Sequence, residues 1–354
     1  MRVLKTIFLF PAFIAAVLLT SCKEEEPDIQ KGAFSDGIFI VNEGPFQTGT
    51  GTVSFFKPDS NLTEHDIFAA VNGRPLGNIA QSMTIYNGKA YIVVNNADKI
   101  EIVDAATFKS SGTVTGLKNP SQFIGIDENK AYVSNWNGNI AVVDLVSNTV
   151  TKTIASGTGP DAMLKTGNYV FVANTGGFGI DSTVTVIDFT TDKVVKTIKV
   201  GKAPSGLVSD AGGKIWVLCK GSGYDGWPQP GDTPGKLLRI DPATLKIDYT
   251  YNFTATNVHP DKLVIDKQKT KAYFLFNYGI YRFDINTAGA APEKVLSRSF
   301  YSLGYENKTG YLYAADAKDY VSNGIVLRIN AANGQTIDSV QSGIIPRAFA
   351  FPEQ

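Results

Sequence analysis

The chain has 354 residues, and its 33 Lys and Arg balance 33 Asp and Glu, so its formal net charge at pH 7 is zero. A neutral chain without a basic run lacks the electrostatic footprint of a nucleic-acid-binding protein, which excludes that class of partner. Of the two cysteines, Cys22 ends an N-terminal leader, and Cys219 alone remains for the folded part. An intramolecular disulfide is therefore excluded, and a hydrophobic core must stabilise the fold.

The first residues have the features of a secretory signal peptide. Arg2 and Lys5 form a positive n-region, and the apolar run over 7–19 is shorter than the about 20 residues of a transmembrane helix. Leu19-Thr20-Ser21-Cys22 resembles the bacterial lipobox, in which the cysteine is acylated and becomes the first residue of the mature protein. We expect 1–21 to be a lipoprotein signal peptide and Cys22 to carry the membrane anchor.

A charged segment follows the lipidation site. Lys23-Glu24-Glu25-Glu26 resembles the signal of one lysine and several acids that directs Bacteroidetes lipoproteins to the outer face of the outer membrane. The alternative is a solvated charged tether. We expect 22–34 to be a lipidated flexible tether, 35–354 to be one domain, and the protein to face the cell exterior from the outer membrane.

Beyond the tether, one unit of sequence recurs, and its most regular part is a short alternating strand. Seven copies are present, at 37–42, 90–95, 131–135, 169–174, 214–219, 272–277 and 311–316. A further alternating strand follows six of them, at 99–104, 139–144, 183–188, 236–241, 280–284 and 324–330. Such short strands with almost no helical pattern are typical of all-β folds.

Proline marks the start of most units. The starts are Pro120, Pro160, Pro204, Pro260 and Pro346, with an unmarked one near Ser302. The first four lie 40 to 56 residues apart, close to the period of a four-stranded propeller blade. The sequence therefore predicts an all-β, seven-bladed β-propeller of four-stranded antiparallel blades.

The two ends of the chain complement each other. The first unit begins at its second strand, whereas 346–351 has the form of a first strand with nothing after it. Pairing these ends would remove the open edges of the ring. We expect the C-terminal strand to complete the N-terminal blade.

One face of such a propeller is predicted to bind a ligand. The loop after the second strand and the loop that enters the next blade open on the same face, and amide and aromatic side chains dominate there. The candidate ligand-binding residues are Asn42, Glu43, Phe46, Asn95, Asn96, Asn135, Trp136, Asn174, Phe178, Tyr224, Trp227, Asn277, Tyr278, Asp316, Tyr320 and Arg347. Each Asn also suits a structural turn, but aromatic residues among Gly and polar residues indicate a binding surface.

The longest of these loops follows Cys219 and continues to Gly235. Long loops inside compact domains are commonly functional or disordered. Because Tyr224 and Trp227 lie in this one, we favour a functional loop.

The sequence offers few candidates for catalytic residues. His65 and His259 are far apart in the repeat order, Cys219 closes an apolar strand, and no nucleophile elbow or phosphate loop is present. We expect no catalytic residue, no metal and no cofactor. The alternative is that Glu43, Asp161 and Asp261 hold a calcium ion at the channel mouth, as in propeller lactonases.

Three segments carry a family resemblance. Val41-Asn42-Glu43-Gly44, the stretch 72–77 (NGRPLG) and the strand 183–188 resemble YncE-like propellers, and among them the lipid-anchored Bacteroidetes members that include BtuG-type cobalamin-binding proteins. The resemblance implies a non-catalytic surface lipoprotein that captures a scarce solute, cobalamin first, and passes it to a TonB-dependent outer-membrane transporter. The alternatives are a protein-interaction module and a calcium-dependent hydrolase or lactonase.

Overall fold

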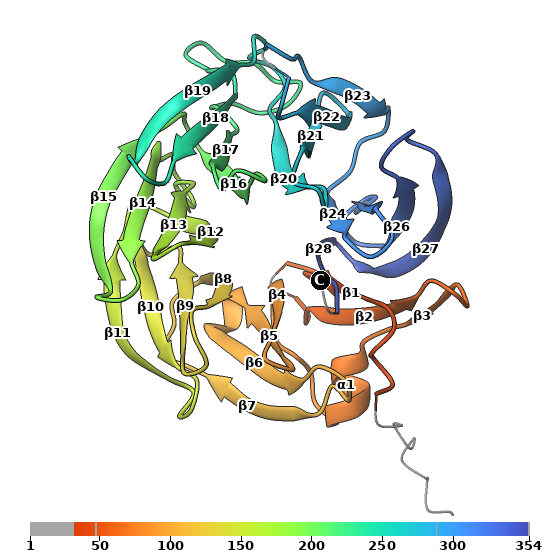
Figure 1. Ribbon diagram of the computed structural model, residues 1–354. Helices are drawn as coiled ribbons and strands as arrows, with labels where there is room; N and C mark the ends of the chain where they lie inside the picture. Colours follow the sequence, from red (N-terminus) through yellow and green to blue (C-terminus); the bar gives the residue numbers. More distant parts are fainter. Residues whose placement is uncertain (1–31, 47, 288, 353–354) are drawn as a thin grey trace, which may run out of the picture.

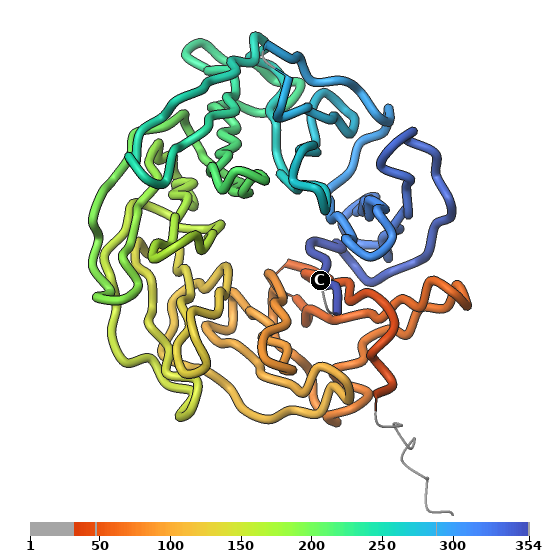
Figure 2. The backbone as a smooth tube through the Cα atoms, viewed as in Figure 1, coloured from red at the N-terminus to blue at the C-terminus, as the bar shows by residue number. Residues whose placement is uncertain are grey.

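The alternating segments of the sequence form β-strands in the computed structural model, which describes residues 32–46, 48–287 and 289–352. The strands make seven four-stranded antiparallel sheets arranged as the blades of a ring (Figures 1 and 2). This confirms the predicted seven-bladed β-propeller. The expected signal peptide, the lipidated Cys22 and most of the tether lie outside the described residues.

The blades follow chain order around the ring. From its inner to its outer strand, blade 1 contains β28 (Pro346–Ala350), β1 (Ile38–Asn42), β2 (Thr52–Lys57) and β3 (Leu62–Glu64). In the same direction, blade 2 contains β4 (Ala80–Tyr86), β5 (Lys89–Val94), β6 (Lys99–Asp104) and β7 (Ser110–Val114). Blade 3 contains β8 (Pro120–Gly125), β9 (Lys130–Asn135), β10 (Asn139–Asp144) and β11 (Thr149–Ala155).

The second half of the ring repeats the pattern. Blade 4 contains β12 (Pro160–Thr166), β13 (Tyr169–Asn174), β14 (Thr183–Asp188) and β15 (Lys193–Lys199). Blade 5 contains β16 (Pro204–Ser209), β17 (Ile215–Cys219), β18 (Lys236–Asp241) and β19 (Lys246–Asn252). Blade 6 contains β20 (Asp261–Ile265), β21 (Lys271–Phe276), β22 (Gly279–Asp284) and β23 (Glu293–Leu296), and blade 7 contains β24 (Ser302–Glu306), β25 (Tyr311–Asp316), β26 (Asn323–Asn330) and β27 (Thr336–Ile344).

Helical structure in the described residues is limited to two short elements in the connections. The helix α1 (Ile67–Asn72) lies between blades 1 and 2, and the 3-10 turn η1 (Asn95–Ala97) follows β5. Among the residues with described structure, no helix is both long enough and apolar enough to span a membrane.

The ring closes as predicted. The C-terminal β28 pairs antiparallel with β1, with Phe39 opposite Ala350 and Val41 opposite Ala348. Figure 1 shows the C-terminal end beside β1 in the first blade. Because both ends of the chain contribute to one sheet, the inner edge of β1 is paired and the first blade has four strands like the others.

The core is divided among the junctions between neighbouring blades. The described residues form seven apolar clusters, and each cluster joins side chains from two adjacent sheets. The second and third strands supply most of them, and all five residues of β1 and of β17 are buried. Outer strands such as β15 are largely exposed. The resulting scaffold is rigid and holds its loops in fixed positions.

The apolar packing begins earlier than the predicted end of the tether. Phe34 is buried, and its ring packs edge-on against Phe55 at 5.2 Å between centroids. Its backbone N–H also donates to the carbonyl of Ala106 at 3.1 Å. Phe34 is therefore part of the folded domain in this structure.

Candidate ligand-binding face

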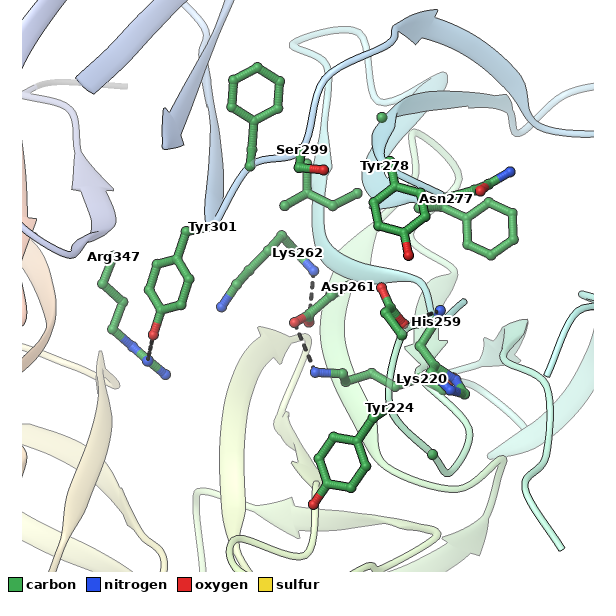
Figure 3. Close-up of a pocket in the computed structure, with 16 residues that line it drawn as sticks. Lys220, Tyr224, His259, Asp261, Lys262, Asn277, Tyr278, Ser299, Tyr301 and Arg347 are labelled. Carbon is green, nitrogen blue, oxygen red and sulfur yellow. Dashed lines mark hydrogen bonds and ion pairs between the residues drawn. The ribbon is translucent and has the colours of Figure 1, made fainter. Parts of the chain in front are cut away.

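The loops expected on one face line a shared cavity there. The β17–β18 connection supplies Tyr224, the β21–β22 turn supplies Asn277 and Tyr278, and the inner strands β20 and β28 supply Asp261 and Arg347. This cavity has a volume of ≈ 530 Å³, and a neighbouring one of ≈ 410 Å³ extends it towards blades 4 and 5. Both are lined by Lys220, Tyr224, His259, Asp261, Lys262 and Arg347. We call the two cavities together the axial cleft, part of which is shown in Figure 3.

Exposed aromatic side chains surround the axial cleft on the same face. Six predicted aromatic residues have exposed fractions between 54% and 93%, namely Phe46, Phe178, Tyr224, Trp227, Tyr278 and Tyr320. Trp136 is half-buried, and Phe178 meets it edge-on at 5.6 Å between ring centroids. The Trp136 indole N–H is buried and has no hydrogen-bond partner among the described residues. The six exposed rings are held by loops of five different blades and present apolar surface to solvent.

The long β17–β18 connection is anchored over blade 6. The Gly226 N–H donates to the carbonyl of Asn257 at 2.9 Å, and the Asp225 carboxylate accepts from the His259 N–H at 2.8 Å. The loop therefore has a defined course and places Tyr224 at the cleft.

Four of the predicted Asn side chains are used inside the protein. Asn42, Asn95, Asn135 and Asn174 are buried, and each forms hydrogen bonds to protein groups. Asn174, for example, donates to Thr183 and Thr185 and accepts from Ser156, which lies in the connection from blade 3. These amides hold neighbouring blades or the connections between them, and none of the four lines the cleft.

The other predicted polar residues differ in their partners and in whether they line the cleft. Asn96 is exposed and donates to Asn78 at 2.7 Å, whereas Asn277 is exposed and lines the cleft. Asp316 accepts from Arg298 at 2.8 Å. Of the predicted amides, Asn277 is thus the one that the structure places at the cleft wall.

An ion pair connects blades 5 and 6 at the cleft. The Lys220 ammonium lies 3.0 Å from the Asp261 carboxylate, and Asp261 also accepts from the Lys262 N–H at 2.9 Å. Burial opposes ionisation of Asp261, but the charges of Lys262 and Lys220 outweigh it and hold its pKa below the ordinary value. The carboxylate of Asp261 in turn raises the pKa of Lys220. Both groups are therefore charged at neutral pH.

A second charged group lies across the cleft on blade 1. Glu43 accepts a short hydrogen bond from Arg347 and another from the Tyr301 hydroxyl at 2.9 Å. Burial disfavours the Arg347 charge, but Glu43 outweighs this effect and raises its pKa. Burial also raises the pKa of Tyr301, which stays a neutral hydroxyl. Glu43 is thus occupied with Arg347 and Tyr301.

The three carboxylates proposed for calcium have separate partners. Glu43 binds Arg347, Asp261 binds Lys220, and Asp161 accepts a short hydrogen bond from Ser121. Among the described residues, no group of three or more His, Cys, Asp or Glu side chains is placed to hold a metal ion. The calcium alternative therefore lacks the oxygen cluster that it requires.

Cys219 and the two histidines are dispersed, as the repeat order predicted. Cys219 is buried in the core of blade 5, and burial raises the pKa of its thiol to about 12. His65 lines a separate pocket of ≈ 210 Å³ between blades 7 and 1. His259 lies at the cleft, where its Nδ1 is 2.9 Å from the Lys220 carbonyl and its Nε2 is buried without a described partner.

Sequence reasoning missed Lys262 and Tyr301. Both line the axial cleft, and the Lys262 ammonium lies 5.8 Å from the centre of the Tyr301 ring. The repeat alignment could have revealed Lys262, because it is a charged residue at the second position after the proline that opens a blade, where the other blades with such a proline have uncharged residues. The residues at this position in blades 3, 4, 5 and 1 are Gln122, Ala162, Gly206 and Ala348.

Comparisons with known proteins agree with the fold. A quinoprotein alcohol dehydrogenase-like protein from Bacteroides thetaiotaomicron superposes with a TM-score of 0.70 at 18% identity, covering 90% of this chain and 79% of its own. Hydrazine synthase of Kuenenia stuttgartiensis superposes with a TM-score of 0.63 at 16% identity, covering 77% of this chain and 90% of its own. At such identities the likeness shows the fold alone.

Sequence comparison identifies the family. No curated protein matches the chain. The family described as a domain of unknown function, DUF5074, matches residues 36–352, which is almost the whole of the predicted mature part. The chain belongs to the DUF5074 family.

Proposed function

We propose that this propeller is a non-catalytic capture protein that binds a large solute over its axial cleft. The observation that carries the proposal is the arrangement of exposed aromatic rings around a charged, water-accessible cleft on a rigid scaffold. Large apolar groups rarely remain exposed in one region without a partner. The cleft volume of ≈ 530 Å³ lies within the range common for ligand pockets, about 300 to 1,000 Å³.

Cobalamin is the first ligand to test. Cobalamin offers the apolar edges of its corrin ring to aromatic side chains, its side-chain amides to polar groups such as Asn277, and the phosphodiester of its nucleotide tail to a cation. The resemblance to lipid-anchored YncE-like propellers supports the same choice. A solute of this size would cover the mouth of the cleft, where Tyr224, Trp227 and Tyr278 are exposed.

The cellular setting belongs to the same proposal. A lipid on Cys22 would hold the propeller at the outer membrane, facing the exterior, beside a TonB-dependent transporter that receives the ligand. Several acyl chains hold a protein durably, whereas one chain binds reversibly. The segment from Lys23 onward would let the ring tilt over its partner.

Calorimetry with cyanocobalamin tests the proposal. We expect saturable binding, and we expect Tyr224→Ala with Trp227→Ala to weaken it by about 2 kcal/mol, as loss of aromatic contacts at binding hot spots does. Val146→Ala is the matched control, because Val146 is 77% exposed on the β10–β11 turn, at the other face. No heat and no thermal shift at a ligand concentration of about 1 mM would refute capture of cobalamin.

A further inference from the structure

The starting point is a lysine whose ammonium group has no ionic partner in the described structure. The Lys262 side chain leaves β20 and extends towards Tyr301 and Arg347 across the cleft (Figure 3). Its backbone N–H is bonded to Asp261, but no described carboxylate lies within ion-pair distance of its Nζ. The three N–H donors of the ammonium are therefore turned to the cleft.

The backbone at this position is strained. Lys262 has a φ of 58°, in the left-handed region that side-chain-bearing residues rarely adopt. The pairing of β20 with β21 shifts register between Asp261 and Val264, so a bulge accommodates the conformation. Strain of this kind is concentrated at ligand-binding positions, where the surrounding structure enforces it. Here it directs a cation to the mouth of the cleft.

Arg347 brings further donors to the same region. Its Nη1 is engaged by Glu43 and Tyr301, whereas no hydrogen bond is found from its Nε or Nη2 to a described residue. Arg347 and Lys220 both act on Lys262 as like charges. The Asp261 carboxylate offsets part of this repulsion, but it forms its ion pair with Lys220, and Asp161 accepts from Ser121. The centre of the cleft thus has N–H donors of Lys262 and Arg347 that no described side chain accepts.

We propose that Lys262 and Arg347 form an anion subsite that binds a phosphate or carboxylate group of the captured solute. An anion between them satisfies unused N–H donors of both residues and relieves their mutual repulsion. The subsite rests on the proposed capture function and names the chemical class that it selects. Tyr301 forms one wall, with its neutral hydroxyl held by Glu43.

Titration of the full chain with small anions tests the subsite. The probes are orthophosphate and citrate, which separate phosphate from carboxylate recognition, with sodium chloride used to keep the ionic strength constant. The readouts are calorimetry and the shift of the thermal unfolding midpoint with anion concentration. We expect at least one probe to bind, and Lys262→Met to weaken it about tenfold, as loss of a charged hydrogen bond does.

Two further variants test whether the effect is specific to the cleft and whether the cleft binds an anion or a cation. Lys109→Met is the charge-matched control, because Lys109 is exposed on the connection between β6 and β7, away from the cleft. Asp261→Asn removes the counter-charge of Lys220 and should tighten anion binding. A cation-binding centre would respond in the opposite way, with weaker binding of its ion.

The outcomes separate the subsite from the capture function. Cyanocobalamin binding without any effect of orthophosphate, citrate or Lys262→Met would overturn the subsite and leave capture standing. Anion binding that depends on Lys262 in a protein that ignores cyanocobalamin would support the subsite and refute cobalamin as the solute. Equal anion affinity in the wild type and in Lys262→Met would overturn the subsite whichever ligand binds.

Discussion

Replacing Asn42 by Ala should destabilise the junction at which the ring closes. Asn42 ends β1, is fully buried, and forms hydrogen bonds within blade 1 and to the neighbouring blade 7. Its Nδ2 donates to Thr52 and Ser54 at 3.1 Å, and its Oδ1 accepts from the Ser342 hydroxyl at 2.7 Å and the Gly343 N–H at 3.1 Å. The amide thereby joins the last strand of blade 7 to the second and third strands of blade 1.

The loss of stability depends on which partners of Asn42 can form other hydrogen bonds in the variant. The hydroxyls of Thr52, Ser54 and Ser342 can rotate towards other acceptors, whereas the Gly343 N–H has a fixed direction. Leaving a buried donor unpaired costs about 1 to 3 kcal/mol, and each further lost bond costs about 1 kcal/mol or less. We expect a total loss of about 3 kcal/mol, which for a domain of this size lowers the unfolding midpoint by about 5 °C.

Thermal and urea unfolding, followed by tryptophan fluorescence and circular dichroism, measure this change. Asn96→Ala is the matched control, since Asn96 is exposed and its one described bond goes to Asn78. The control should stay within about 0.5 kcal/mol of the wild type. An Asn42→Ala protein as stable as Asn96→Ala would refute the structural role, and reduced ligand binding at unchanged stability would restore Asn42 to the ligand face.

Two further predictions concern protonation. Anion binding at Lys262 should weaken as the pH rises from 7 towards 10, because burial, aided by the like charges of Arg347 and Lys220, lowers the pKa of this lysine below the ordinary value of about 10.4 and removes its charge earlier. The charged or titratable groups facing it are Asp261, Asp161, Lys220, Arg347 and Tyr301. The pKa of Asp261 is lowered and those of Lys220, Arg347 and Tyr301 are raised, so these groups keep their charge states over this pH range. The loss of anion affinity should therefore report the deprotonation of Lys262 and be absent in Lys262→Met. An identical pH profile in that variant would contradict the assignment. Cys219 should resist a thiol reagent at pH 8 in a Cys22→Ala chain and react fully after unfolding, because it is buried and its thiol pKa is about 12; rapid labelling of the native protein would contradict this burial.

The sequence predicted the ring well because its strands are defined by local alternation. The strands at 169–174 and 311–316 have the same bounds in the structure as in the sequence pattern. Proline marked the inner strands because its missing N–H is tolerated at a strand start, as at β8 and β12. Ring closure was predictable because the first unit lacks its first strand, whereas the C-terminal segment is a first strand without the rest of its unit.

The site was predicted only in part, because a side chain's direction depends on bulges and neighbours. Asn42 and Asn277 end the equivalent strand segments, yet one is buried between blades and the other is exposed at the cleft. Asn277 has a φ of 43° and lies in a turn, whereas Asn42 is the last residue of a strand. The repeat pattern cannot distinguish these two environments. Lys262 was missed for a related reason, because alternation alone does not reveal the bulge that turns it towards the cleft.

The differences between the blades explain where we expect the ligand to bind. Each junction between blades repeats the same apolar packing, so the scaffold itself does not favour any sector of the ring. The sector of blades 5, 6 and 1 differs because it combines the anchored 220–235 connection with the charged side chains of Lys262 and Arg347. Aromatic contacts supply affinity for any ligand with a suitable apolar surface, whereas a fixed pair of cations selects those that carry a negative group. We therefore expect substitutions at Tyr224 and Trp227 to weaken all ligands of this face alike, and Lys262→Met to weaken only the anionic ones.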